Sequence, residues 1–138
     1  MKRALLYIVL VLSAIPSLAT EIHPESCVVN SADGCDSFVT GNTTYSVDTT
    51  ISSDVYVLSG GTLTITATVT MANNARIVVA DGGTVIIEGI LKNARLQLSS
   101  GSSLTVRSFG WIKLLSGSEL NIPSGATMNI DCGGITYM

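Results

Sequence analysis

The chain has 138 residues, of which 46% are hydrophobic and only 12% are charged, and its formal net charge is −3. This length accommodates one domain. So few charges argue against a nucleic-acid-binding protein, because phosphate contacts need clustered Lys and Arg. A single His excludes multi-His metal sites and His-dependent catalytic triads. We therefore expect no cofactor, no bound metal and no nucleic-acid partner.

The first 19 residues have the three parts of a secretory signal peptide. Lys2 and Arg3 supply the positive n-region, residues 4–15 the apolar h-region, and residues 17–19 a small-x-small cleavage site. We predict cleavage before Thr20 and a protein that is secreted or held at the cell surface or outer envelope, with no membrane span after cleavage. An uncleaved membrane anchor is the alternative, although the apolar run is short for a span.

Residues 20–58 are predicted to form an N-terminal cap and a first partial coil. Export permits disulfides, and Cys27 and Cys35 flank a polar, turn-forming stretch, so we favour a bond between them. Cys132 lies near the other end of the chain and is expected either as a buried free thiol or in an intermolecular bridge. The apolar residues of this segment that we expect to be buried are Tyr45, Val47, Val55 and Val57.

Residues 59–138 repeat a short pattern in which a turn precedes an apolar-x-apolar triplet. Gly-led units begin at Gly60, Gly82, Gly101 and Gly125, and an Asn-Ala-Arg unit occurs at 74–76 and again at 93–95. Alternation within the triplets predicts short strands with one buried face. The first apolar positions of the triplets, which we expect to point inward, are Val55, Leu63, Val69, Ile77, Val85, Ile90, Leu96, Leu104, Ile112, Leu120, Met128 and Ile135.

The spacing of these strands favours a parallel β-helix. Steps of 5 to 8 residues are shorter than the 8 to 12 typical of an antiparallel sandwich. Three strands per coil give repeats of 22, 19 and 24 residues, counted from Leu63 through Val85 and Leu104 to Met128. A two-sided solenoid with 16-residue coils fits only the last of these segments. We predict about four three-sided coils stacked as a solenoid.

Stacking places residues of successive coils side by side on the outer surface. One outward column is polar and uncharged, and two further columns bring opposite charges together at some of their steps. These columns are Thr62, Thr84, Ser103 and Thr127; Thr66, Glu88, Arg107 and Asp131; and Asp54, Arg76, Arg95 and Glu119. Asn74 and Asn93 are expected at corresponding corners, where asparagine tolerates a left-handed backbone.

Residues 59–130 resemble secreted bacterial right-handed parallel β-helix (β-solenoid) repeat proteins, on the strength of the Gly-Gly-x-Leu-x-Ile and Asn-Ala-Arg-Ile-Val-Val units. The resemblance implies an extracellular right-handed β-helix, sometimes associated with adhesion or polysaccharide. It transfers no catalytic residue, since the shared motifs are structural. We expect a non-enzymatic exported interaction module at the cell surface or outside the cell, for adhesion or carbohydrate binding.

The alternative function is a polysaccharide lyase or glycoside hydrolase of the β-helix type. Such enzymes need clustered carboxylates and often a basic residue. The candidates are Asp81, Glu88, Arg107 and Asp131, with Glu88 and Asp131 two coils apart and Arg107 between them. A plain charge ladder would produce the same arrangement, so we assign no catalytic residue.

Outward side chains supply the candidate binding surfaces. The alternating threonines from Thr62 to Thr70 resemble the Thr-x-Thr rows of ice-binding solenoids, but the pattern does not persist and threonine is a common strand residue. Trp111 and Tyr137 are expected on one face in successive coils, where exposed rings would form a platform for polysaccharide. The last coil has no evident covering element, so we predict self-association or partner docking there, with Cys132, Tyr137 and Met138 in the contact.

Overall fold

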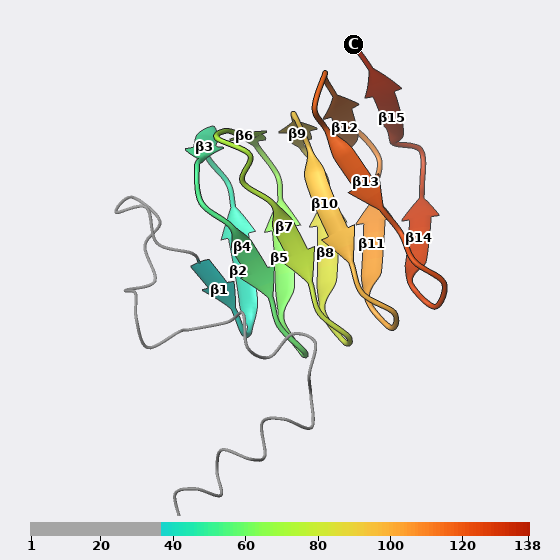
Figure 1. Ribbon diagram of the computed structural model, residues 1–138. Coiled ribbons are helices and arrows are strands. Elements are labelled where there is room, and N and C mark those ends of the chain that lie inside the picture. The colour runs from blue at the N-terminus through green and yellow to red at the C-terminus, as the bar shows by residue number, and fades with distance from the viewer. Residues whose placement is uncertain (1–36) are drawn as a thin grey trace, which may run out of the picture.

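A computed structural model describes residues 37–138 of the chain, which form a parallel β-solenoid built from three sheets of five strands each (Figure 1). Three consecutive strands complete one turn, because each sheet takes every third strand of the chain. The structure confirms the predicted all-β fold of stacked three-sided coils, with five turns in place of about four. No helix within residues 37–138 has the length and apolar character needed to cross a membrane.

The three sheets run along the length of the solenoid. Sheet A contains β1 (Ser37–Val39), β4 (Val55–Val57), β7 (Ile77–Val79), β10 (Arg95–Leu98) and β13 (Glu119–Asn121). Sheet B contains β2 (Asn42–Tyr45), β5 (Thr62–Ile65), β8 (Thr84–Ile87), β11 (Ser103–Val106) and β14 (Thr127–Ile130). Sheet C contains β3 (Thr49–Ile51), β6 (Thr68–Met71), β9 (Ile90–Lys92), β12 (Trp111–Leu114) and β15 (Gly134–Tyr137).

The additional turn comes from β1, β2 and β3, which lie within the segment expected to hold a cap and a partial coil. All three strands pair in parallel with the strand one turn later, so this turn is complete. The next strand, β4, buries Val55 and Val57 as predicted, and Tyr45 on β2 is half-buried against the core. Val47 is 68% exposed, so the prediction that it is buried is wrong. Val47 stands in the connection between β2 and β3, outside the alternation of either strand. Cys27 and Cys35 lie outside the described residues.

The interior of the solenoid is a continuous apolar core. Leu63, Val85 and Leu104 are cross-strand partners in sheet B and are fully buried, which confirms the predicted column. Matching columns of buried Val, Ile and Leu line the other two sheets. Each fully buried side chain of this size contributes about 1.5–3 kcal/mol of hydrophobic free energy. The stability of the solenoid therefore comes from its interior.

One interior position differs from the prediction. Ile90 was expected to point inward, but Leu91 is the fully buried residue of β9 and is the partner of Val69 and Ile112. Two adjacent apolar residues leave the parity of this strand ambiguous in the sequence. In the structure, the parity of β9 is set by the corner that precedes the strand. There the backbone N–H groups of Glu88 and Gly89 both donate to the carbonyl of Ile65.

The corners of the turns use left-handed backbone conformations. Asn74 and Asn93 have φ angles of 62° and 56°, as predicted, and Asn93 Nδ2 donates to the carbonyl of Met71 one turn earlier at 2.8 Å. Gly101 has φ +85°, and a Cβ on it would collide with the carboxylate of Asp81. Asp81 thus packs over the following glycine corner.

The observed register of β9 predicts that two neighbouring substitutions lower the free energy of unfolding by different amounts. Leu91→Ala removes a fully buried side chain and should lower the free energy of unfolding by about 2–5 kcal/mol. Ile90→Ala, on the outer face of the same strand, should cost less than about 1 kcal/mol. Denaturant unfolding of both variants measures the difference, and a larger loss for Ile90→Ala would contradict the assigned register.

Candidate functional site

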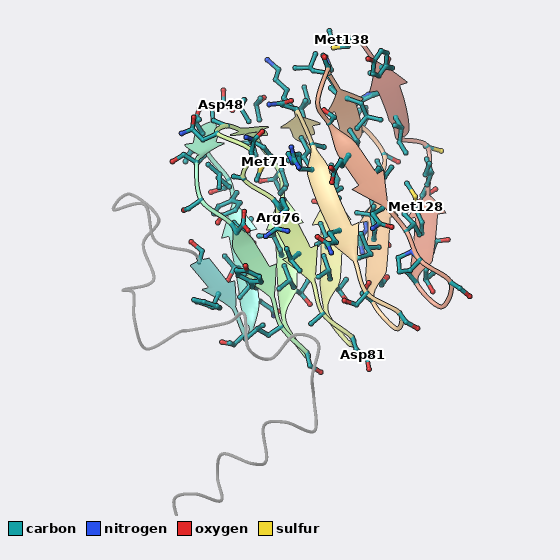
Figure 2. The ribbon with its side chains drawn as sticks, viewed as in Figure 1. Asp48, Met71, Arg76, Asp81, Met128 and Met138 are labelled. Carbon is teal, nitrogen blue, oxygen red and sulfur yellow. The ribbon has the colours of Figure 1, made fainter. Side chains whose placement is uncertain are left out.

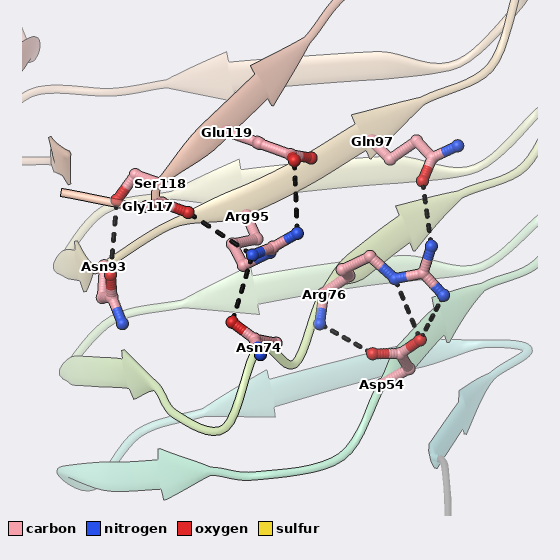
Figure 3. Close-up of polar contacts among 9 residues, drawn as sticks. All are labelled: Asp54, Asn74, Arg76, Asn93, Arg95, Gln97, Gly117, Ser118 and Glu119. Atoms are coloured by element: carbon pink, nitrogen blue, oxygen red, sulfur yellow. Dashed lines mark hydrogen bonds and ion pairs between the residues drawn. The ribbon is translucent and has the colours of Figure 1, made fainter. Parts of the chain in front are cut away.

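A polar ladder covers the outer side of sheet A (Figure 3). Arg76 Nη2 lies 2.6 Å from Asp54 Oδ2, and Arg76 Nε donates to the same oxygen at 3.1 Å. The backbone N–H of Arg76 also donates to Asp54 Oδ1 at 2.8 Å. This hydrogen bonding to Asp54 raises the pKa of Arg76 above its ordinary value, although partial burial acts in the opposite direction.

The ladder also brings Arg76 and Arg95 to adjacent positions. Each of these arginines donates a hydrogen bond to a neutral side chain of the other one's turn. Arg95 lies 3.2 Å from Glu119, and its Nη1 donates to Asn74 Oδ1 at 3.3 Å. Arg76 Nη1 reaches Gln97 Oε1 at 3.4 Å. The predicted column of Asp54, Arg76, Arg95 and Glu119 is therefore present, with ion pairs at the two steps that join opposite charges. Its charges are bound to one another, so this face is a structural ladder.

Two of the three candidate catalytic carboxylates, Glu88 and Asp131, occupy the corner between sheets B and C. Glu88 Oε2 lies 2.8 Å from Arg107 Nη1 across one turn. Backbone bonds from Glu88, Arg107 and Asp131 to the preceding turn place these residues in one column, as predicted. Asp81 stands at a different corner, against Gly101. The four candidates do not converge, and Glu88 is occupied by an ion pair.

The outer face of sheet B carries two columns of polar residues between buried ones. Thr62, Thr84, Ser103 and Thr127 are successive cross-strand partners, which confirms the predicted column. The second column is interrupted by Ile86, which lies between Thr64 and Thr105. No charged residue occurs among the described outward positions of these strands. The face has the composition of an ordinary solvated parallel sheet.

Sheet C has the outer face with the most exposed aromatic surface. Trp111 is 42% exposed and is the cross-strand partner of Ile90 and Gly134. A Cβ on Gly134 would lie 2.6 Å from Trp111 Cζ3, so the six-membered ring of the indole covers this glycine. The ring is thereby supported by the last turn while part of it remains open to solvent.

A second aromatic residue stands at the corner that leads into β12. Phe109 is 85% exposed and has φ 70°, a left-handed conformation that is unusual for a bulky side chain. The corresponding corners after β5 and β8 contain two residues, whereas this corner contains four, from 107 to 110. The longer corner presents an apolar ring to solvent two residues before Trp111, at a cost in backbone strain.

Two lysines adjoin Trp111 on the same outer face. Lys92 and Lys113 are cross-strand partners, and each follows by two residues the partner pair Ile90 and Trp111. Because the side chains of positions i and i+2 share one face of a strand, the aromatic and cationic columns lie next to each other. We define Lys92, Phe109, Trp111 and Lys113 as the sheet C patch.

The remaining candidate residues belong to the last turn. Tyr137 is 73% exposed and is the partner of Leu114, so it lies in the inward register of β15 and does not share a face with Trp111. Met138 is 64% exposed. Cys132 is free and exposed, with φ 62°, so the expectation of a buried thiol is wrong. Met128 and Met138 both lie at the C-terminal end of the solenoid (Figure 2).

The lysine pair could not be found in the sequence once Ile90 was assigned to the interior of β9. With Ile90 taken as inward, Lys92 would also point inward and would not align with Lys113. A consistent rule that a charged residue faces outward would have selected Leu91 as the interior residue. Phe109 carries no signal beyond the length of its corner.

Comparison of the chain with protein-family models, with curated proteins and with solved structures finds no match in any of the three. Within residues 37–138, no three His, Cys, Asp or Glu side chains come together in a way that would hold a metal ion. The functional argument accordingly depends on the chemistry of the described surfaces.

The ion pairs Asp54–Arg76 and Glu88–Arg107 are expected to contribute different amounts to the free energy of unfolding. Asp54→Ala removes a salt bridge and the acceptor of a backbone N–H, so it should lower the free energy of unfolding by about 1.5–3 kcal/mol. Glu88→Ala breaks a pair whose side chains are 34% and 53% exposed and should cost about 0.2–1 kcal/mol. Denaturant unfolding compares them, and equal losses would show that the backbone bond to Asp54 adds nothing.

Proposed function

We propose that this protein is an exported, non-enzymatic β-solenoid that acts as an interaction module at the cell surface or outside the cell, in polysaccharide binding or adhesion. The observation that carries the proposal is the partly exposed Trp111 on the regular outer face of sheet C, with exposed Phe109 beside it in the chain. Aromatic rings of this kind offer flat apolar surface to sugar rings. The signal-peptide pattern and the resemblance to secreted bacterial repeat proteins support export.

The site geometry favours binding over catalysis. Glu88, one of the two carboxylates expected for hydrolysis or elimination, is held by Arg107 at 2.8 Å. The exposed aromatic residues lie on β12 and in the 107–110 corner before it, which also holds Arg107, whereas the candidate carboxylate Asp81 stands at a different corner. Polysaccharide lyase or glycoside hydrolase remains the competing function that the following measurement separates from binding.

Binding without turnover is the expected behaviour on a polysaccharide panel. The mature protein should be retarded in affinity electrophoresis through at least one polysaccharide gel, and Trp111→Ala should weaken that retardation about tenfold, whereas Thr105→Ala on sheet B should not. Assays for reducing ends and for unsaturated products should stay at background. Product formation that disappears in Glu88→Gln or Asp131→Asn would replace this proposal with the enzymatic one.

The last turn supports a second contact, with another copy of this chain. The terminal strands of the three sheets at this end of the described residues are β13, β14 and β15. Their outer edges present backbone N–H and C=O groups with which a further strand could pair. The residues exposed around this end include Ile130, Tyr137 and Met138, which are 50%, 73% and 64% exposed. We propose that a second copy covers this apolar end.

Self-association through this turn is measurable by size-exclusion chromatography with light scattering under reducing conditions. The mature protein should form a dimer or larger species whose mass falls to that of a monomer in Ile135→Lys. Ile135 is a half-buried apolar residue in the inward register of β15, so a lysine there would place a charge at the end that the second copy covers. Thr136→Lys, on the outer face of the same strand, should leave the mass unchanged. A monomeric wild-type protein would refute self-association.

A further inference from the structure

Among the described residues, the cations of this protein fall into two groups. Each of the arginines, Arg76, Arg95 and Arg107, forms an ion pair with a carboxylate. Lys92 and Lys113 form no ion pair within residues 37–138, although the chain as a whole has more acidic than basic residues. The two unpaired cations are also direct cross-strand partners.

This lysine pair has an energetic cost that the fold does not require. Partners on adjacent parallel strands are about 4.8 Å apart at the backbone, and like charges in directly opposite positions destabilise a sheet. The corresponding positions on the neighbouring turns hold Thr70 and Thr136, so neutral side chains are compatible with this column. An anion bound between the two ammonium groups would remove the repulsion and gain charge-assisted hydrogen bonds.

The position of Trp111 specifies what the anion is attached to. Trp111 precedes Lys113 by two residues on β12, which corresponds to about 6.6 Å along the strand. Its indole rests on Gly134 and is 42% exposed, so the ring is held in place and offers apolar surface beside the charges. A ligand that fits both features has a ring with an apolar C–H face for the indole and a negative group attached to that same ring. A sugar that carries a carboxylate has this chemistry.

We propose that the sheet C patch binds an acidic polysaccharide of the polyuronate class, with a sugar ring against Trp111 and its carboxylate between Lys92 and Lys113. This inference rests on the proposed polysaccharide-binding function and names its ligand class. A carboxylate at the start of this sheet, that of Asp48, accepts a hydrogen bond from Thr68 N–H at 2.9 Å. Asp48 stands two turns before β9, so it leaves the lysines free to bind an anion.

Alginate is the probe, and its propylene glycol ester, in which carboxylates are masked, is the matched uncharged ligand. The mature protein should bind alginate in affinity electrophoresis and should bind the ester at least about fivefold more weakly. Lys92→Gln and Lys113→Gln should each weaken alginate binding about three- to fivefold. Arg95→Gln, which changes the net charge equally on the outer face of sheet A, should leave alginate binding unchanged. Thermal melts establish that every variant is folded.

Four results would each overturn the inference. Equal binding of alginate and its ester, or alginate binding that is unchanged in both lysine variants, would exclude recognition of the carboxylate by this pair. Equal affinity for single-stranded DNA or dextran sulfate would indicate attraction to any polyanion. Retardation by neutral polysaccharides alone, still lost in Trp111→Ala, would leave the proposed function standing while refuting the ligand class.

Discussion

Parallel hydrogen bonding between successive turns is the constraint on which the whole structure depends. Each strand of sheets A, B and C pairs in register with the strand one turn away. All strands of a sheet therefore share the same alternation of interior and exposed side chains. A shift of one residue exchanges the two sets completely. The solenoid tolerates corners of different length because the register is restored in each following strand.

Stability and surface chemistry are thereby separated. The stacked Val, Ile and Leu columns are fully buried and supply the hydrophobic free energy, whereas each exposed ion pair contributes little. The pair of Asp54 and Arg76 is an exception, since Asp54 also accepts a backbone hydrogen bond of the next turn. Outer faces are consequently free to vary in chemistry without a change of fold.

The three outer faces show this freedom. Sheet A joins its charges into a ladder in which Gln97 and Asn74 bridge the step between two arginines. Sheet B carries Thr and Ser, while sheet C places Trp111 beside an unpaired cross-strand pair of lysines. The same stacking that neutralises charge on one face concentrates it on another. The column of Lys92 and Lys113 on sheet C thus departs from the complementary or neutral pairing found in the columns of sheets A and B.

The sequence by itself determined the solenoid and most of its register. Recurrent glycine-led turns and period-2 apolar triplets identify the columns of Leu63 and Ile77, because side-chain alternation is a local property of a strand. Only the tertiary structure decided the parity of β9, where Ile90 and Leu91 are equally apolar, and with it the alignment of Lys92 with Lys113. Likewise, exposure of Val47 and the support of Trp111 by Gly134 depend on where a corner returns the chain and which residue lies one turn away. Those relations join residues roughly twenty positions apart, and no local pattern encodes them.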